Sequence, residues 1–168
     1  MIHHACHCEA ILANRRSNPQ TIIKNHIKFD RIAKKISTKG AIMIIIGHKA
    51  LKSPTFRAIQ SIESISKTFA NEIVFFSNDL ALANHCNAYE IAYSVEIKRI
   101  VDLLIYANLG AKYIVIRHKN LAKKCQKIAN EYFLDAKILL VIKNDKGIES
   151  AANMGIDGVI YERVLKEA

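Results

Sequence analysis

The chain has 168 residues, enough for one ordinary domain with a single hydrophobic core. Hydrophobic residues make up 51% of it, and it contains only six Gly and two Pro, which excludes disordered and collagen-like classes. The net charge of +10 predicts attraction to phosphates, nucleic acid or anionic membrane surfaces.

The N-terminal quarter carries most of this charge. Residues 1–40 hold eight Lys and Arg against two acids, so they contribute +6 of the total +10. Apolar residues recur on one side of segment 21–36, as expected for an amphipathic helix. They are Ile22, Ile23, Ile27, Ile32 and Ile36. Because no Gly/Ser-rich or Pro-rich linker follows, we expect a single domain over 1–168, with a basic helical segment at 1–39 packing on its sheet.

From residue 40 onward, short runs rich in Ile and Val alternate with stretches of helical periodicity. The runs are apolar on both faces, which is typical of buried parallel strands. The six predicted strands are 41–47, 72–76, 89–95, 112–117, 137–142 and 157–161.

Helices are predicted between these strands. The first begins at Ser53-Pro54, where Ser can cap the helix and Pro can occupy its first turn. Its apolar face would comprise Phe56, Ile59, Ile62, Ile65 and Phe69. A short helix follows Asp79. The next ends near Gly110, with Ile97, Ile100, Val101, Leu104 and Ile105 directed inward. Two more are predicted, one with Leu121, Cys125, Ile128 and Tyr132 along one side, and one from Asp145 to near Gly155.

The alternation of strands and helices predicts an α/β fold with a mostly parallel sheet of about six strands and flanking helices. Either a reduced TIM-barrel-like sheet or an open, flavodoxin-like sheet fits this pattern. In both, ligands bind at the carboxyl ends of the strands, where the loops and helix N-termini gather.

Basic side chains outnumber acidic ones in the predicted loops at the carboxyl ends, which favours a phosphorylated or other anionic small molecule as ligand. Candidate ligand-binding residues are Lys49, Asn78, Asp79, Arg117 and Asp145. His48 and His118 each follow a predicted strand directly and are candidate catalytic residues, since His transfers protons near neutral pH. The alternative is that these loops are simply polar and solvated, with both histidines capping helices.

The first residues concentrate metal-binding side chains. His3 and His7 have the i,i+4 spacing that chelates transition metals, and Cys6 and Cys8 lie beside them. A divalent metal is therefore the one cofactor that the sequence suggests. The alternative is an exposed terminus that binds metal weakly, because no second Cys/His pair completes the site locally.

Several other classes of protein are disfavoured. The chain has no glycine-rich phosphate loop and no Ser or Cys nucleophile elbow. We expect a cytoplasmic protein that does not associate with membranes, because neither a signal peptide nor a spanning segment is found. The basic N-terminal helix offers an alternative function, in which the chain is a non-catalytic module that binds nucleic acid or a protein.

The segment from Gly110 to Val164, with Val141-Ile-Lys-Asn-Asp and Gly155-Ile-Asp-Gly-Val-Ile, resembles the last βα units of phosphate-binding TIM barrels, in particular glycerophosphodiester phosphodiesterases. Ile46-Gly47-His48-Lys49 is similar to the His-Arg on that family's first strand. The resemblance implies a barrel, a catalytic role for His48 and a phosphodiesterase-like hydrolase or lyase. This chain has Ile73-Val74-Phe75-Phe76 where the family carries its metal-binding Glu-x-Asp pair.

Overall fold

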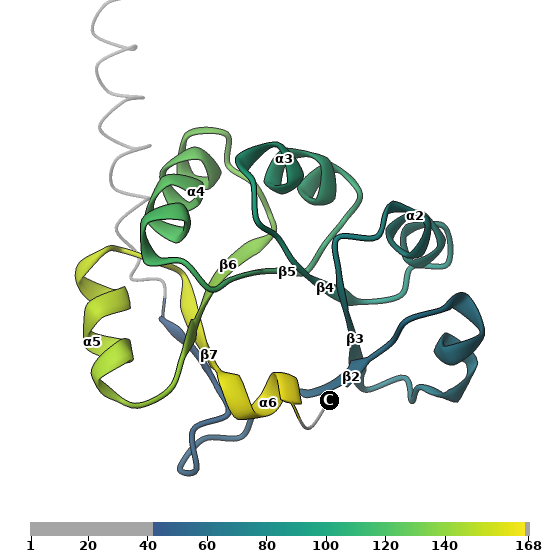
Figure 1. Ribbon diagram of the computed structural model, residues 1–168, viewed down its shortest axis with the longest axis horizontal. Helices are drawn as coiled ribbons and strands as arrows, with labels where there is room; N and C mark the ends of the chain where they lie inside the picture. The colour runs from purple at the N-terminus through teal and green to yellow at the C-terminus, as the bar shows by residue number, and fades with distance from the viewer. Residues whose placement is uncertain (1–41, 167–168) are drawn as a thin grey trace, which may run out of the picture. The chain divides into compact units, whose positions relative to one another are not determined.

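The computed structural model describes residues 42–166, which form one parallel sheet of seven strands with flanking helices (Figure 1). The strands are β1 (Ile44–Ile46), β2 (Thr55–Ala58), β3 (Glu72–Ser77), β4 (Tyr93–Glu96), β5 (Tyr113–Ile116), β6 (Lys137–Ile142) and β7 (Gly158–Tyr161). The helices are the 3₁₀ helix η1 (Ile62–Lys67) and the α-helices α2 (Leu80–Ala88), α3 (Ile100–Asn108), α4 (Lys119–Glu131), α5 (Lys146–Asn153) and α6 (Glu162–Lys166). The predicted basic helix within 1–39 lies outside the described residues.

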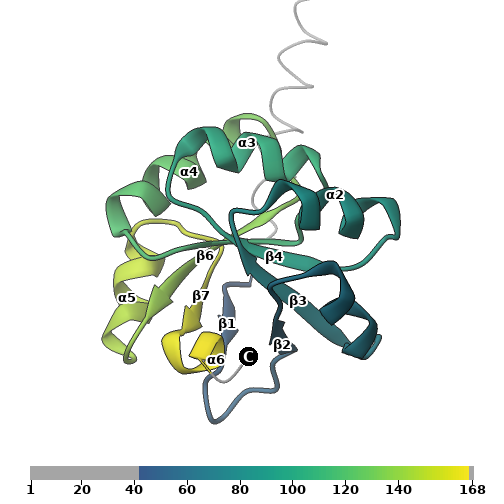
Figure 2. The ribbon, with the colours of Figure 1, turned by 45° about the vertical axis from the view of Figure 1, so that its right-hand side comes forward.

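The strand order is β1-β7-β6-β5-β4-β3-β2, and every neighbouring pair is parallel. From β2 to β7 each strand pairs with the next one in the chain, as in a barrel and unlike the permuted order of a flavodoxin-like sheet. The sheet curls, with α2 to α5 on its convex side (Figures 1 and 2). Helix α6 contacts both β7 and β2. The fold is therefore α/β, consistent with a reduced TIM-barrel-like sheet.

Successive side chains of a strand point to opposite faces of the sheet, so the buried side chains form two clusters, one on each face. Under the helices, Val74, Ile114 and Ile138 pack with residues such as Leu103 of α3. The other face of the sheet carries a smaller cluster, the inner cluster: Ile46, Phe56, Ile73, Phe75, Val115, Leu139, Ile160 and, from α6, Leu165. Each fully buried aliphatic side chain contributes about 1.5–3 kcal/mol of hydrophobic stabilisation. The central strands are apolar on both faces because both of their faces are covered.

All six predicted strands are present, and β2 is a seventh. The helix predicted to begin at Ser53-Pro54 is wrong, since Thr55–Ala58 is a strand and only Ile62–Lys67 is helical, as a 3₁₀ helix. Phe56 belongs to the inner cluster and Ile59 to the cluster under the helices. The spacing of these residues imitates a helical face, but they occupy opposite sides of the sheet.

The predicted inward face of α3 is also wrong in part. Ile97 is buried, but Val101 is 58% exposed, Leu104 38% and Ile105 40%. The buried residues of the helix are instead Asp102, Leu103 and Tyr106, which the pattern of aliphatic residues did not distinguish. Helix α3 consequently has apolar side chains on two sides.

Candidate functional site

The parallel sheet brings the predicted site residues to one edge. His48 and Lys49 follow β1, Asn78 and Asp79 follow β3, Arg117 and His118 follow β5, and Asp145 follows β6. All these positions are at the carboxyl ends of parallel strands, as expected for ligand sites in this class of fold. Their surroundings at this edge differ considerably, however.

Arg117 is at the centre of an ion-pair network. Its Nε and Nη2 atoms donate to the two carboxylate oxygens of Glu96, at 2.8 and 3.1 Å. Its Nη1 lies 3.5 Å from Glu162 Oε1, and Lys166 Nζ lies 3.4 Å from the same oxygen. The hydrogen bonds that Arg117 donates to Glu96 are the main cause of the raised pKa of Arg117. Two carboxylates thus compensate most of the Arg117 charge, which leaves it a weak attractor for a further anion.

Glu96 and Glu162 were not among the predicted site residues. They lie 21 residues before and 45 residues after Arg117 in the sequence and approach it only because β4 and β7 share the sheet with β5. Each is an acid at the carboxyl end of a strand, and that position was the one sequence signal that could have found them.

Asn78 and Asp79 make structural contacts at the start of α2. Asp79 caps the helix, since its Oδ1 accepts from the backbone N–H groups of Ala81 and Leu82 at 2.9 and 3.0 Å. Asn78 has a positive φ of 32°, and its Oδ1 accepts from the Tyr106 hydroxyl at 3.1 Å. The N-terminus of α2 is therefore occupied by a carboxylate of the chain itself.

His48 lies in a small polar cluster between β1 and β7. Its Nδ1 accepts from the Ala50 backbone N–H at 3.2 Å, and its Nε2 is 4.0 Å from Asp145 Oδ2. The Tyr161 hydroxyl donates to the other oxygen of Asp145, and this hydrogen bond is the main cause of a raised pKa of Tyr161. With Nδ1 engaged by the backbone, the proton of a neutral His48 ring is on Nε2, directed toward Asp145.

His118 has a more open environment. It is exposed at the N-cap of α4, where its side chain makes no capping hydrogen bond. The next residue, Lys119, donates from Nζ to Ser150 Oγ of α5 at 3.1 Å. Two strands, β7 and β6, separate β1 from β5, which puts His48 and His118 about 14 Å apart around the sheet. A single small ligand would have to span that distance to contact both.

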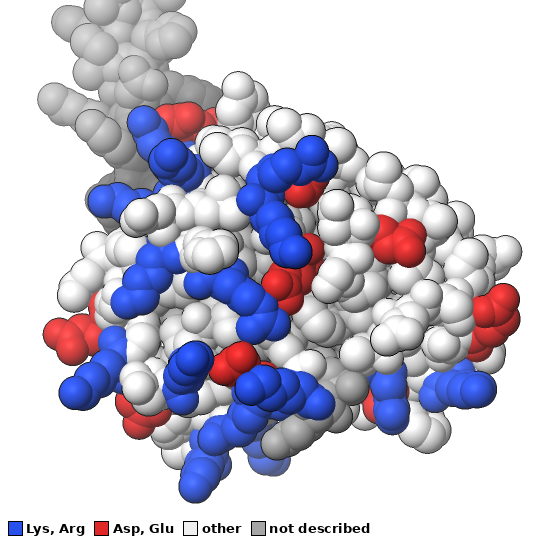
Figure 3. Space-filling model, in the orientation of Figure 1, with Lys and Arg blue, Asp and Glu red and all other residues white. Residues whose placement is uncertain are grey.

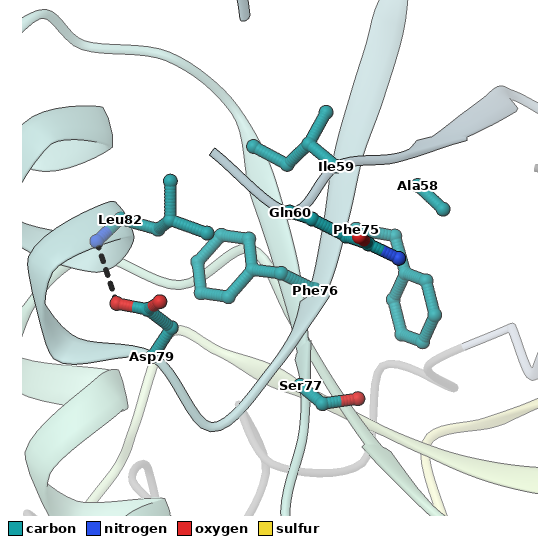
Figure 4. Close-up of a pocket in the computed structure, with 8 residues that line it drawn as sticks. All are labelled: Ala58, Ile59, Gln60, Phe75, Phe76, Ser77, Asp79 and Leu82. Carbon is teal, nitrogen blue, oxygen red and sulfur yellow. Dashed lines mark hydrogen bonds between the residues drawn. The ribbon is translucent and has the colours of Figure 1, made fainter. Parts of the chain in front are cut away.

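A pocket of about 380 Å³ lies at the carboxyl ends of β2 and β3 (Figure 4). Phe75 and Phe76 project to opposite sides of β3 there, and Gln60, Ser77 and Asp79 provide polar groups. Ala58, Ile59 and Leu82 complete the lining. Among residues 42–166, no Lys, Arg or His lines this pocket. Lys and Arg instead gather over α4, α5 and α6, at the left of Figure 3, with acids among them.

The predicted metal ligands His3, Cys6, His7 and Cys8 lie outside the described residues. Within 42–166, no group of three or more His, Cys, Asp or Glu side chains is placed to hold a metal ion. The same residues contain no helix with the length and hydropathy that crossing a bilayer requires. Cys86 and Cys125 are buried in the core, and burial raises the pKa of each thiol to about 11.

The fold and this edge define an α/β protein with a curled, TIM-barrel-like sheet whose polar residues gather at the carboxyl ends of its strands. No protein-family model matches the chain, and no curated protein matches it. Its function therefore has to be inferred from the site.

Proposed function

We propose that this chain binds a phosphorylated or other anionic metabolite at the carboxyl ends of β5, β6, β7 and β1. One observation carries the proposal. Four exposed lysines, Lys49, Lys119, Lys143 and Lys146, follow strands at this edge, and within the described residues none of them lies within 4.0 Å of a carboxylate. We call these four residues the basic rim. Uncompensated lysines in loops and at the first positions of helices, as here, are well suited to phosphate oxygens.

The N-terminus of α4 supports the same location. The N-cap residue of α4 is His118, and its side chain makes no capping hydrogen bond. The backbone N–H groups in the first turn of α4 therefore donate no hydrogen bond to the N-cap side chain. A phosphate group accepts from such N–H groups and is stabilised by the helix dipole. The start of α2 contrasts with it, because Asp79 already accepts two of those N–H groups. We therefore assign the anion to the β5–β7 side of the edge.

Of the two candidate catalytic histidines, His118 is the better placed to act on such a ligand. Its ring is exposed beside Lys119 and the start of α4, whereas His48 Nδ1 is engaged by a backbone N–H. The resemblance to glycerophosphodiester phosphodiesterases extends the proposal to hydrolysis or a lyase reaction of a phosphodiester. Bis(4-nitrophenyl) phosphate, with and without added divalent metal, is a suitable probe of that activity.

Isothermal titration calorimetry with inorganic pyrophosphate tests the binding proposal. We expect the combined variant Lys119→Ala, Lys143→Ala and Lys146→Ala to bind at least tenfold more weakly, because each charged hydrogen bond contributes about 1.5–3 kcal/mol. A control is Lys112→Ala with Lys137→Ala, which removes two exposed lysines, against three in the rim variant, from the amino ends of β5 and β6. The control should bind like the wild type.

A third variant addresses the alternative function, nucleic-acid or protein binding by the basic N-terminal segment. It replaces Lys24, Lys28, Lys34 and Lys35 by Gln. Loss of pyrophosphate binding in this variant alone, with the rim variant unchanged, would contradict the proposed site. Binding that falls equally in the control pair would mean that net charge, and not the rim, attracts the anion.

A further inference from the structure

The outer side of α3 carries no charged side chain, and neither do the exposed positions of the neighbouring helix α2. The exposed positions of α3 are Val101, Leu104, Ile105 and Asn108. Leu80, at the start of the neighbouring helix α2, is 49% exposed. On α4, by contrast, exposed positions hold lysines such as Lys123, Lys124 and Lys127. We call Leu80, Val101, Leu104 and Ile105 the α2–α3 apolar face.

The α2–α3 apolar face includes a groove. A hollow of about 530 Å³ runs between the two helices and is lined by Leu80, Asn84, Leu104, Ile105, Asn108 and Leu109. Val101, 58% exposed, stands one turn from Leu104 and Ile105 along α3. A ridge of aliphatic side chains and an apolar groove therefore lie next to each other on one surface. In Figure 3 the surface over α2 is mostly uncharged.

Apolar side chains on two sides of a helix suit it to bury both of those sides. The buried side of α3 packs on the sheet through Leu103 and Tyr106. Leaving the other side in water would cost hydrophobic free energy at each large aliphatic side chain. The outer side of α3 thus requires a partner of its own.

We propose that the partner is a second copy of this chain, bound through the same face by a two-fold axis. Ridge and groove adjoin on one surface, so two copies can each place the ridge of α3 in the groove of the other, as an isologous interface requires. In that arrangement the two α3 helices run antiparallel, with Leu104 and Ile105 near the axis.

Charge complementarity favours this partner. Lys98 is exposed just before α3, while the last turn of α3 contains no basic residue. An antiparallel pair brings Lys98 of each copy to the carbonyl end of the other copy's α3, where a cation is favourable. Arg99 adds no repulsion, because its Nη2 is paired with Asp102 at 2.7 Å. The uncharged face is also poorly suited to nucleic acid, which needs basic contacts.

Sedimentation equilibrium of the full chain tests the proposal. In 0.15 M salt, which screens the net charge of +10 over about 8 Å, we expect a mass twice the 18.9 kDa of one chain. The variant Val101→Lys with Leu104→Lys should dimerise at least tenfold more weakly. Both positions are exposed and Lys is a good helix former, so far-UV circular dichroism should stay unchanged. Tyr132→Lys, at an exposed aromatic after α4, is the control and should remain dimeric.

Leu104→Cys gives a second measurement, because a residue near the two-fold axis meets its own copy. In a chain whose Cys6 and Cys8 are replaced by Ser, we expect this variant to form a disulfide-linked dimer under mild oxidation. The same chain with Leu104 retained should not do so, because Cys86 and Cys125 are buried. A wild-type chain that is monomeric over the micromolar to millimolar range would overturn the proposal and point to residues 1–41 or another protein as the partner. A dimer that survives Val101→Lys with Leu104→Lys would place the interface elsewhere and overturn it equally.

Discussion

Replacing Gly158 by Ala should destabilise the fold through a clash between β7 and β1. A Cβ at position 158 would lie 2.5 Å from the Ile44 carbonyl oxygen, 2.7 Å from Ile44 Cβ and 2.9 Å from Leu139 Cδ2. Gly158 pairs with Ile44 on one side and with Leu139 on the other, so the backbone cannot relax toward either neighbour without disturbing the ladder. Overpacking of this kind costs about 1–3 kcal/mol.

The lower entropy of the unfolded chain with Ala opposes the destabilisation by the clash, but it is the smaller effect. Ala in place of Gly restricts the unfolded chain and would stabilise a strand by about 0.5–1 kcal/mol if the methyl group fitted. We therefore expect the free energy of unfolding to fall by about 1–2 kcal/mol, which corresponds to a fall in Tm of about 2–8 °C for a chain of this size. Urea and thermal denaturation followed by circular dichroism measure both quantities. Gly155→Asn is a control, because Gly155 has φ +68° and no atom within 4 Å of its added Cβ. Unchanged or higher stability of Gly158→Ala would refute the close approach of β1 to β7.

Three further predictions concern single groups. Asp79→Ala should cost about 1 kcal/mol in urea melts because it removes the α2 cap, and Asp79→Ser should recover most of it; equal losses in both would contradict the capping role. The raised pKa of about 11 for Cys86 and Cys125 predicts very slow native-state labelling of these two thiols by a thiol reagent, read by peptide mass spectrometry so that Cys6 and Cys8 are followed separately; rapid labelling of Cys86 or Cys125 at pH 8 would exclude this burial. The free energy of unfolding should also fall as pH rises from about 9 through 11, since the unfolded thiols ionise first. Glu96→Gln should strengthen pyrophosphate binding severalfold in calorimetry by freeing charge on Arg117, and weaker binding would show that Arg117 needs Glu96 to hold its position.

Much of the fold could be predicted because each central strand is an Ile- and Val-rich run between helical patterns. The exceptions have a physical reason. β2 is four residues at one edge of the sheet, with only Phe56 buried, so its apolar content is too small to mark a strand. On α3, hydrophobicity does not distinguish a side chain that faces the sheet from one that faces outward, and the pattern therefore assigned Val101, Leu104 and Ile105 to the wrong side.

The site could be predicted as a location but not as a set of contacts. That Arg117 and His118 lie at the carboxyl edge follows from the parallel topology alone. The pairing of Arg117 does not follow from topology alone, because its partners are Glu96 at the end of β4 and Glu162 at the start of α6, 21 and 45 residues away in the sequence. The capping of α2 by Asp79 is a local contact, and an Asp just before a helical stretch is a sequence pattern that predicts such a cap.

The proposed anion site can be tested most directly by titrating the ¹⁵N-labelled full chain with inorganic pyrophosphate and following its amide resonances. We expect saturable shifts at Lys119, Asn120 and Leu121, in the first turn of α4, together with Lys143 and Lys146. The first turn of α2, which Asp79 caps, should not shift. Saturable shifts confined to residues 1–41, or shifts at the start of α2 without any at α4, would contradict anion binding at the carboxyl ends of β5 to β7.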